Sequence, residues 1–358
     1  MQTQSNKIDF KGEKIFAGFD VHLKSWKVTI MTDKLTHKTF CQDPKPEVLY
    51  NYLVKNFPGG TYYSAYEAGF CGYWIHNQLL ELGVKSIVVH AADVPTTGKE
   101  KVNKNDKRDS KKIARALRNG ELNPIYVPSM VTIEDRGLVR LRTTKVNELA
   151  KYKCRIKSNL HFRGIEYPEA FNNEHTHWSN RFNKWLESIQ MTEPSGKVMF
   201  DDLLESSLHL RTSILKLTRE IRILSKTDRY KVRQELLRSI PGIGYITAMI
   251  ILTELETINR FANFDKLCGY IGLVPSTNSS GEKEIIGNLT PRGHTLRSSI
   301  IESAWVAARL DPALCKSYHE YCSRMDSNKA IIRIARKLLS RIMYVLKNDK
   351  PYVCSIAK

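Results

Sequence analysis

Apolar residues in the first third of the chain occur in short runs separated by turn residues. Such runs indicate β-strands, whereas longer amphipathic stretches that end at glycine indicate helices. Over residues 14–128 the predicted order is strand, strand, strand, helix, strand, helix, strand, helix, at 15–21, 26–32, 36–42, 46–56, 61–67, 72–82, 84–90 and about 106–118. We therefore expect an α/β domain in this region.

This order of strands and helices is that of the ribonuclease H-like fold. In that arrangement Asp20 lies on the first, central strand, and Glu67 lies at the end of the fourth strand. Asp106 and Asp109 are three residues apart on the final helix, so they share one face of it. The predicted fold therefore brings four carboxylates toward one another.

Carboxylates at the ends of buried strands are costly unless a cation or a hydrogen bond compensates them. Asp20 and Glu67, together with the Asp-x-x-Asp pair, could hold two hard cations against a phosphodiester. The alternative is that all four are surface or capping acids, and Asp106 could cap the helix that follows it. Spacing alone leaves both interpretations open.

The spacing of apolar residues changes to a helical period beyond residue 129. We expect a helical linker over 129–230, although residues 164–197 show no period. An a/d pattern typical of a coiled coil runs through it, at Leu203, Ser207, Leu210, Ile214, Leu217, Ile221 and Leu224. This seam could close a helical hairpin with the looser stripe at 138–160, or it could join two protomers.

A second compact domain is predicted over residues 231–310. An apolar helix ends at Pro241-Gly242-Ile243-Gly244, and a helix of small apolar residues follows, which is the helix-hairpin-helix pattern. Free amides at the start of that second helix could bind a phosphate near Gly242 and Gly244. The alternative is a plain packing turn. Residues 311–358 read as a basic helical tail, suited to docking or to a further phosphate contact.

Positive charge is in excess and is clustered. The 56 Lys and Arg outnumber the 37 Asp and Glu, which gives a formal net charge of +19. Many of these cations crowd residues 99–118, around Asp106 and Asp109, as expected beside a polyanion. Nucleic acid is therefore the expected partner, and a generally basic soluble protein is the alternative.

Other features of the sequence argue against secreted and membrane proteins. The seven cysteines form no C-x-x-C pair and no zinc spacing, which is typical of reduced thiols. The polar N-terminus lacks the core of a signal peptide, and the longest apolar run is too short to cross a bilayer. We expect an intracellular protein without membrane contact.

Several motifs, taken together and in order, resemble the IS110/IS1111 family of insertion-sequence recombinases. Gly18-Phe19-Asp20-Val21-His22, Tyr66-Glu67-Ala68-Gly69 and Asn105-Asp106-Lys107-Arg108-Asp109 look like that family's DEDD, RuvC-like domain. The turn at 240–244 and the segments 261–283 and 287–297 look like its C-terminal transposase domain. Asn105 and Ser110 depart from the Thr and Ala that many members carry there.

The resemblance implies a composite active site. Asp20, Glu67, Asp106 and Asp109 would bind Mg²⁺ or Mn²⁺, and Ser280 would be the nucleophile that holds a DNA end covalently. Ser279 lies next to it, but Ser280 directly precedes Gly281. From spacing alone, Ser280 would be an ordinary turn residue. Nucleic-acid contacts are expected at Lys104, Lys107, Arg108, Gly242, Gly244, Arg292 and Arg297.

The resemblance also implies partners and a location. Family members act on donor and target DNA under the guidance of a structured RNA that the element encodes. They form dimers that pair into tetramers, and the seam at 203–224 is the expected interface. A prokaryotic cytoplasmic protein that associates with the nucleoid is expected.

Two rival functions fit part of the same pattern. One is a RuvC-like, metal-dependent, structure-specific nuclease that uses water and forms no covalent intermediate. The other is a nucleic-acid-binding protein without catalysis, built on a degraded nuclease fold. The four intact acids argue against the second, because an inactive site has no reason to keep them.

Overall fold

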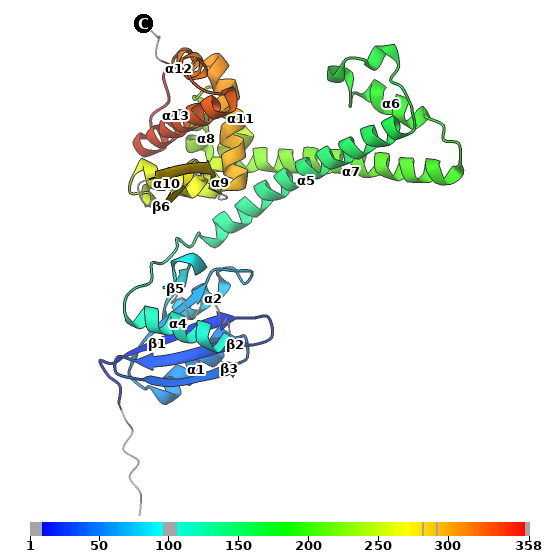
Figure 1. Cartoon of the computed structure of the whole chain (residues 1–358). Helices are drawn as coiled ribbons and strands as arrows, with labels where there is room; N and C mark the ends of the chain where they lie inside the picture. The colour runs from blue at the N-terminus through cyan, green and yellow to red at the C-terminus, as the bar shows by residue number, and fades with distance from the viewer. Residues whose placement is uncertain (1–8, 96–105, 281–282, 291–292, 355–358) are drawn as a thin grey trace, which may run out of the picture. The chain divides into compact units, whose positions relative to one another are not determined.

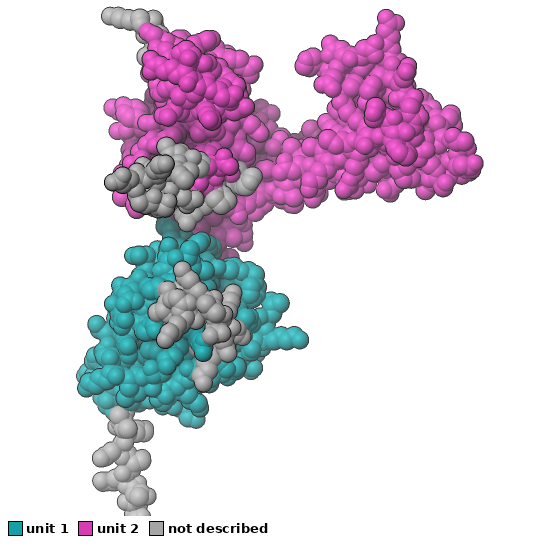
Figure 2. All heavy atoms as spheres, in the orientation of Figure 1, with its two compact units in different colours: residues 1–127 teal, residues 128–358 magenta. Residues whose placement is uncertain are grey.

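The chain divides into two compact units, residues 1–127 and 128–358 (Figure 2). The computed structural model describes residues 9–95, 106–280, 283–290 and 293–354. The sequence predicts three parts within residues 128–358, and in the structure these residues pack as one unit. Each unit is described by itself.

A five-stranded mixed sheet forms the centre of the first unit, with the order β3-β2-β1-β4-β5 (Figure 1). β1 pairs antiparallel with β2, and β2 with β3, whereas β1–β4 and β4–β5 are parallel. The predicted order of elements is confirmed, with the strands at Lys14–Val21, Trp26–Thr32, Thr36–Gln42, Thr61–Glu67 and Lys85–Val89.

Helices cover both faces of this sheet. α1 (Pro46–Asn56) and α2 (Trp74–Glu81) pack on the face that carries Ile15, Ala17 and Phe19 of β1. α4 (Asp106–Arg118) packs on the other face, where Phe16 contacts Ala114. Because side chains alternate along a strand, Gly18 and Asp20 share the α4 face with Phe16.

A close approach between backbones sets the position of α4. A Cβ atom on Gly18 would lie 2.1 Å from the backbone nitrogen of Ala114, so only glycine permits this contact. Buried Ser110 also shares a 2.9 Å hydrogen bond between hydroxyl groups with Thr29 of β2. The serine that departs from the family pattern therefore ties α4 to the sheet.

The second unit begins with a helical hairpin. α5 (Met130–Phe162) and α7 (Pro194–Leu224) run side by side, and α6 (Asn180–Ser188) lies at their far end (Figure 1). Two short 3₁₀ turns, Glu169–Phe171 and Glu174–Thr176, precede α6. The segment without a predicted period thus encloses a small core, formed with both long helices by Ile156, Leu160, Phe171, Phe182, Leu186, Ile189, Phe200 and Leu204.

The predicted seam on α7 packs within the chain. Ser207, Leu210 and Ile221 are buried, and Ile221 shares a core with Val139 of α5. The Arg142 guanidinium also donates a 2.8 Å hydrogen bond from Nε to the Thr218 hydroxyl. The interpretation as an intramolecular hairpin therefore accounts for the pattern, and the seam does not need a second protomer to be buried.

Helices form the remaining core, and one β-hairpin belongs to the same unit. The apolar face of the last helix is buried along its whole length, including Ile334, Leu338 and Ile342, so the predicted basic tail belongs to this core. None of the helices in the described ranges is both long and apolar enough to span a membrane. The elements are α8 (Lys231–Arg238), α9 (Tyr245–Leu255), η4 (Ile258–Arg260), α10 (Phe264–Ile271), β6 (Pro275–Ser280), β7 (Lys283–Leu289), α11 (His294–Leu310), α12 (Pro312–Cys322) and α13 (Ser327–Asn348).

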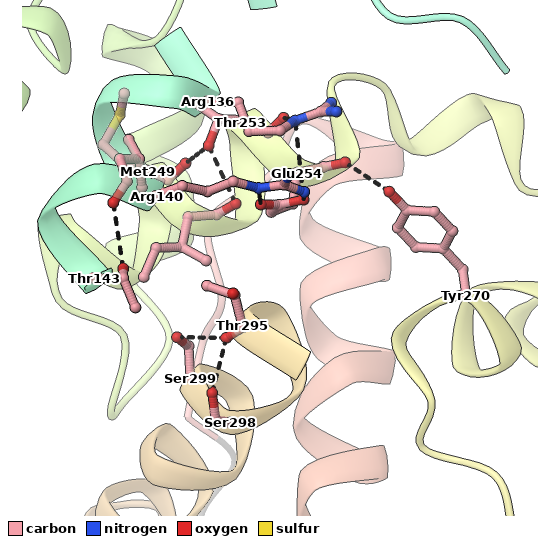
Figure 3. Close-up of polar contacts among 12 residues, drawn as sticks. Arg136, Arg140, Thr143, Met249, Thr253, Glu254, Tyr270, Thr295, Ser298 and Ser299 are labelled. Atoms are coloured by element: carbon pink, nitrogen blue, oxygen red, sulfur yellow. Dashed lines mark hydrogen bonds and ion pairs between the residues drawn. The ribbon is translucent and has the colours of Figure 1, made fainter. Parts of the chain in front are cut away.

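A buried acid joins α5 to this core (Figure 3). Glu254 of α9 accepts two hydrogen bonds from Arg140, at 2.6 Å from Nε and 2.7 Å from Nη2. Arg136 lies 3.9 Å from the same carboxylate, and the Tyr270 hydroxyl donates to the Glu254 carbonyl. Since α5 follows directly after unit 1 in the chain, these bonds fix the start of the second unit.

Candidate active site

Two of the predicted acids end neighbouring parallel strands. Phe19 of β1 is in register with Tyr66 of β4, so Asp20 and Glu67 follow as the next pair at the same edge of the sheet. Their side chains are 27% and 34% exposed, which leaves the carboxylates within reach of solvent and ligand. The sheet topology therefore places these acids side by side, as expected.

The third described acid comes from α4. Asp109 lies 3.6 Å through Oδ1 from the Lys112 ammonium, and that same ammonium lies 3.8 Å from Glu67 Oε1. Asp109 and Glu67 are thus linked through one cation. Asp106 is the first residue of α4, but its side chain lies outside the described part of the chain.

Two further residues at this edge were not expected from the sequence. The His22 imidazole lies 3.3 Å from Asp20 Oδ2, and Lys112 bridges the other two carboxylates. Spacing gave a signal for Lys112, which is three residues after Asp109 and so shares one face of α4 with it. His22 directly follows the end of β1, two residues after Asp20. Nothing in the sequence relates Lys112 to Glu67.

The donor set suits a hard divalent cation. Carboxylate oxygens are the ligands that Mg²⁺ and Mn²⁺ prefer, and the Lys112 ammonium stands between two of them as a cation. The described side chains do not form a ready-made cage, because no group of three or more acids, histidines or cysteines among them is arranged to hold a metal. A metal bound here would require these side chains to rearrange or Asp106 to take part.

The predicted nucleophile lies in the other unit. Ser280 is the last residue of β6 and is in register with Lys283 of β7, so it lies at the end of this antiparallel strand pair. The side chains of Ser279 and Ser280 lie outside the described part of the structure.

The expected phosphate-binding turn connects α8 with α9. Gly242 has a positive φ of 88°, and a Cβ atom there would lie 2.4 Å from the Ser303 carbonyl oxygen of α11. Gly244 is exposed and caps the start of α9, and a Cβ atom added there would meet nothing within 4 Å. Gly242 thus serves packing, and Gly244 leaves the first turn of α9 accessible.

The predicted nucleic-acid contacts are only partly described. Arg108 is exposed on α4, next to the acids. Arg297 is half-buried and donates from Nη1 to the carbonyls of Gly272 and Thr290, so part of its hydrogen-bonding capacity is used inside the unit. Lys104, Arg292 and the side chain of Lys107 lie outside the described residues.

Two family models cover most of the regions that carry these features. Residues 17–163 match a model described as a transposase, of the IS110 DEDD type. Residues 234–320 match a model described as the transposase IS116/IS110/IS902 family. The chain belongs to the IS110 family of transposases. The first match contains all four predicted acids of this transposase, and the second contains Ser280.

Similar proteins carry related names. The chain is 23% identical over 305 residues to the transposase for insertion sequence element IS1533 of Leptospira borgpetersenii, covering 82% of this chain and 85% of that protein. It is 27% identical over 272 residues to the IS1111A transposase of Coxiella burnetii, covering 71% and 70%. A protein named y4qE of Sinorhizobium fredii is 28% identical over 244 residues, which span 68% of this chain but only 58% of that relative. A DEDD transposase domain indicates dependence on a divalent metal.

Proposed function

We propose that unit 1 is a ribonuclease H-like, RuvC-like catalytic domain that cuts DNA strands during transposition. Two features support this proposal. The sheet has three antiparallel strands followed by two parallel ones, with β1 at its centre. Acids from β1, β4 and α4 gather at one edge of it, as a metal-assisted phosphodiester site requires.

The convergence of Asp20, Glu67 and Asp109 is the observation that carries the proposal. Together with Asp106, these residues would hold Mg²⁺ or Mn²⁺. A bound ion would polarise the scissile phosphate and stabilise the charge on the leaving oxygen. Glu67 and Asp109 face one lysine between them, which leaves an excess of negative charge at this pair of carboxylates and favours a dication there.

Ser280 would supply the nucleophile. Its Oγ attacks the phosphorus, and the new Oγ–P bond replaces the bond to the leaving DNA oxygen. Over the whole step, the serine proton is transferred to that oxygen. Attack by the hydroxyl of another DNA end reverses the step and frees the serine. Because the number of phosphodiester bonds is conserved, exchange needs no ATP.

The charge of the chain supports a nucleic-acid partner beyond the cut strand. The net charge of +19 and the basic segment 99–118 suit phosphate contacts with donor and target DNA and with a folded guide RNA. The accessible first turn of α9 at Gly244 offers a further phosphate position.

Assembly into dimers or tetramers would involve the outer face of the α5–α7 hairpin. The seam at 203–224 faces α5, but Leu208, Leu215 and Ile223 of the same helix are 38%, 53% and 62% exposed. They recur at intervals of seven and eight residues, which places them on one side of α7. A second copy of the hairpin could cover that side.

Paired variants test this function. We expect Asp20→Ala and Ser280→Ala each to abolish strand exchange while nucleic-acid binding is retained. Asp33→Ala, which changes an exposed acid in the turn after β2, is the matched control for charge and should remain active. Strand exchange by either Asp20→Ala or Ser280→Ala would contradict the assignment of that residue. DNA cleavage that persists in Ser280→Ala but not in Asp20→Ala would favour the nuclease that uses water.

A further inference from the structure

Lys112 is an unusual lysine because its charged end lies inside the candidate active site. The side chain is only 10% exposed, whereas lysine is among the residues that proteins bury least. Its Nζ lies 3.6 Å from Asp109 Oδ1 and 3.8 Å from Glu67 Oε1. The ammonium therefore faces two carboxylates that belong to different elements of the fold.

The two ion pairs keep these two carboxylates close together, as a bound metal ion otherwise would. Glu67 and Asp109 carry like charges, and without a cation between them they would repel each other. A divalent ion that ligates both carboxylates needs the same region of space and the same oxygen atoms. Two cations a few ångströms apart also repel strongly in a partly desolvated site.

We propose that Lys112 is a built-in competitor of the divalent metal, a positioning residue that occupies the place between Glu67 and Asp109 until the metal displaces it. The metal-free site is then already organised, because α4 and β4 are joined by the lysine. Metal loading requires the ammonium to leave, so Lys112 lowers the affinity for the metal. This inference rests on the metal-assisted function proposed above.

The lysine can leave without unfolding its helix. Four methylene groups separate its ammonium from the backbone, and such side chains move their charged ends while the stem stays packed. Ile113 and Ala114, which follow it, are buried against the sheet and keep α4 in place. A displaced ammonium would remain beside the carboxylates, where it could meet a DNA phosphate.

Lys111 provides a matched control. It is the preceding residue on α4 and carries the same charge, but it is exposed. Lys111→Met removes one positive charge from the surroundings and leaves the bridge between Glu67 and Asp109 intact. Lys112→Met removes the bridge at nearly constant side-chain length, and Lys112→Arg restores the charge.

Titration of Mn²⁺ into the full-length protein, without nucleic acid, tests the competition by calorimetry. We expect Lys112→Met to bind Mn²⁺ roughly tenfold more tightly than wild type, a change of about 1.4 kcal/mol. Lys111→Met and Lys112→Arg should stay within about threefold of wild type, a change below about 0.7 kcal/mol. In EDTA, Lys112→Met should melt at a lower temperature than wild type, and Mn²⁺ should raise its melting temperature by more.

The outcomes separate this inference from the proposed function. Equal Mn²⁺ affinity in wild type and Lys112→Met, with binding that Asp20→Ala abolishes, would overturn the competition and leave the metal site standing. Equal gains in Lys111→Met and Lys112→Met would also overturn it, because general charge would then be the cause. If no variant showed Mn²⁺ binding that depends on Asp20, the metal-assisted function itself would be refuted, and the competition with it.

Discussion

Gly18 should be essential because it lets the helix that carries Asp109 approach the strand that carries Asp20. In Gly18→Ala the new Cβ would lie 2.1 Å from Ala114 N, 2.6 Å from Ala114 Cα and 2.7 Å from the Ser110 carbonyl oxygen. All three are backbone atoms, so a change of rotamer cannot relieve the contact. Raising the shortest distance from 2.1 Å to 3.0 Å requires α4 to move by at least 0.9 Å.

The size of the effect follows from that displacement. Overpacking of this kind costs about 1–3 kcal/mol. The movement would also strain the hydrogen bond between Ser110 and Thr29, which contributes about 1 kcal/mol. We therefore expect unit 1 to lose about 2–4 kcal/mol of stability. Activity should fall as well, since a displacement near 1 Å in an active site can cost on the order of 10²-fold in rate.

Hydrogen exchange measured on α4 peptides, together with urea unfolding, tests this reasoning. Where hydrogen exchange requires the whole unit to open, a loss of 2 kcal/mol or more in stability corresponds to exchange that is at least roughly 30-fold faster. Gly69→Ala is the control, because its added Cβ meets no atom within 4 Å. If Gly18→Ala matched Gly69→Ala in exchange and in urea midpoint, the close packing of α4 on β1 would be refuted.

The fold of unit 1 was largely predictable because its turns are strong signals. Short apolar runs, bounded by turns such as Pro58-Gly59-Gly60, gave strand limits that agree with the structure to within about a residue. The edge where Asp20 and Glu67 meet follows from parallel pairing of β1 with β4, which the order of elements implies.

Features that depend on tertiary contacts were less accessible. In the sequence, Lys112 is one of several cations in a basic run, and only the packing of α4 brings its side chain to Glu67. The segment 164–197 has no period because its core residues come from a 3₁₀ turn, the nine-residue helix α6 and the residue that follows it, and each of these is too short to show a repeat. On α13 the basic residues masked a buried apolar face that makes it a core helix.

Two further predictions concern the second unit. Asp311 is fully buried, and its carboxylate accepts 2.7 Å hydrogen bonds from Arg341 and from the Tyr352 hydroxyl. Asp311→Ala leaves Arg341 without this partner and should cost about 3–5 kcal/mol in urea unfolding; a loss no larger than that of Asp311→Asn would contradict the ion-pair argument. Burial, followed by the bond to Asp311, raises the pKa of Tyr352 from its usual 10.0 to about 12. The resulting stabilisation is full below pH 10 and is lost as pH rises through 12. Tyr352→Phe should lack that loss, and identical stability profiles of wild type and Tyr352→Phe between pH 9 and 12 would refute the assignment.

The covalent step is the central claim, and a denaturing gel tests it most directly. Protein, labelled donor DNA, the RNA transcribed from the element and Mg²⁺ are combined, and labelled DNA that migrates with the protein is measured. We predict an adduct with wild type and with Ser279→Ala, and none with Ser280→Ala or Asp20→Ala. Cleavage of the DNA by wild type without any adduct would contradict the account and identify a nuclease that uses water.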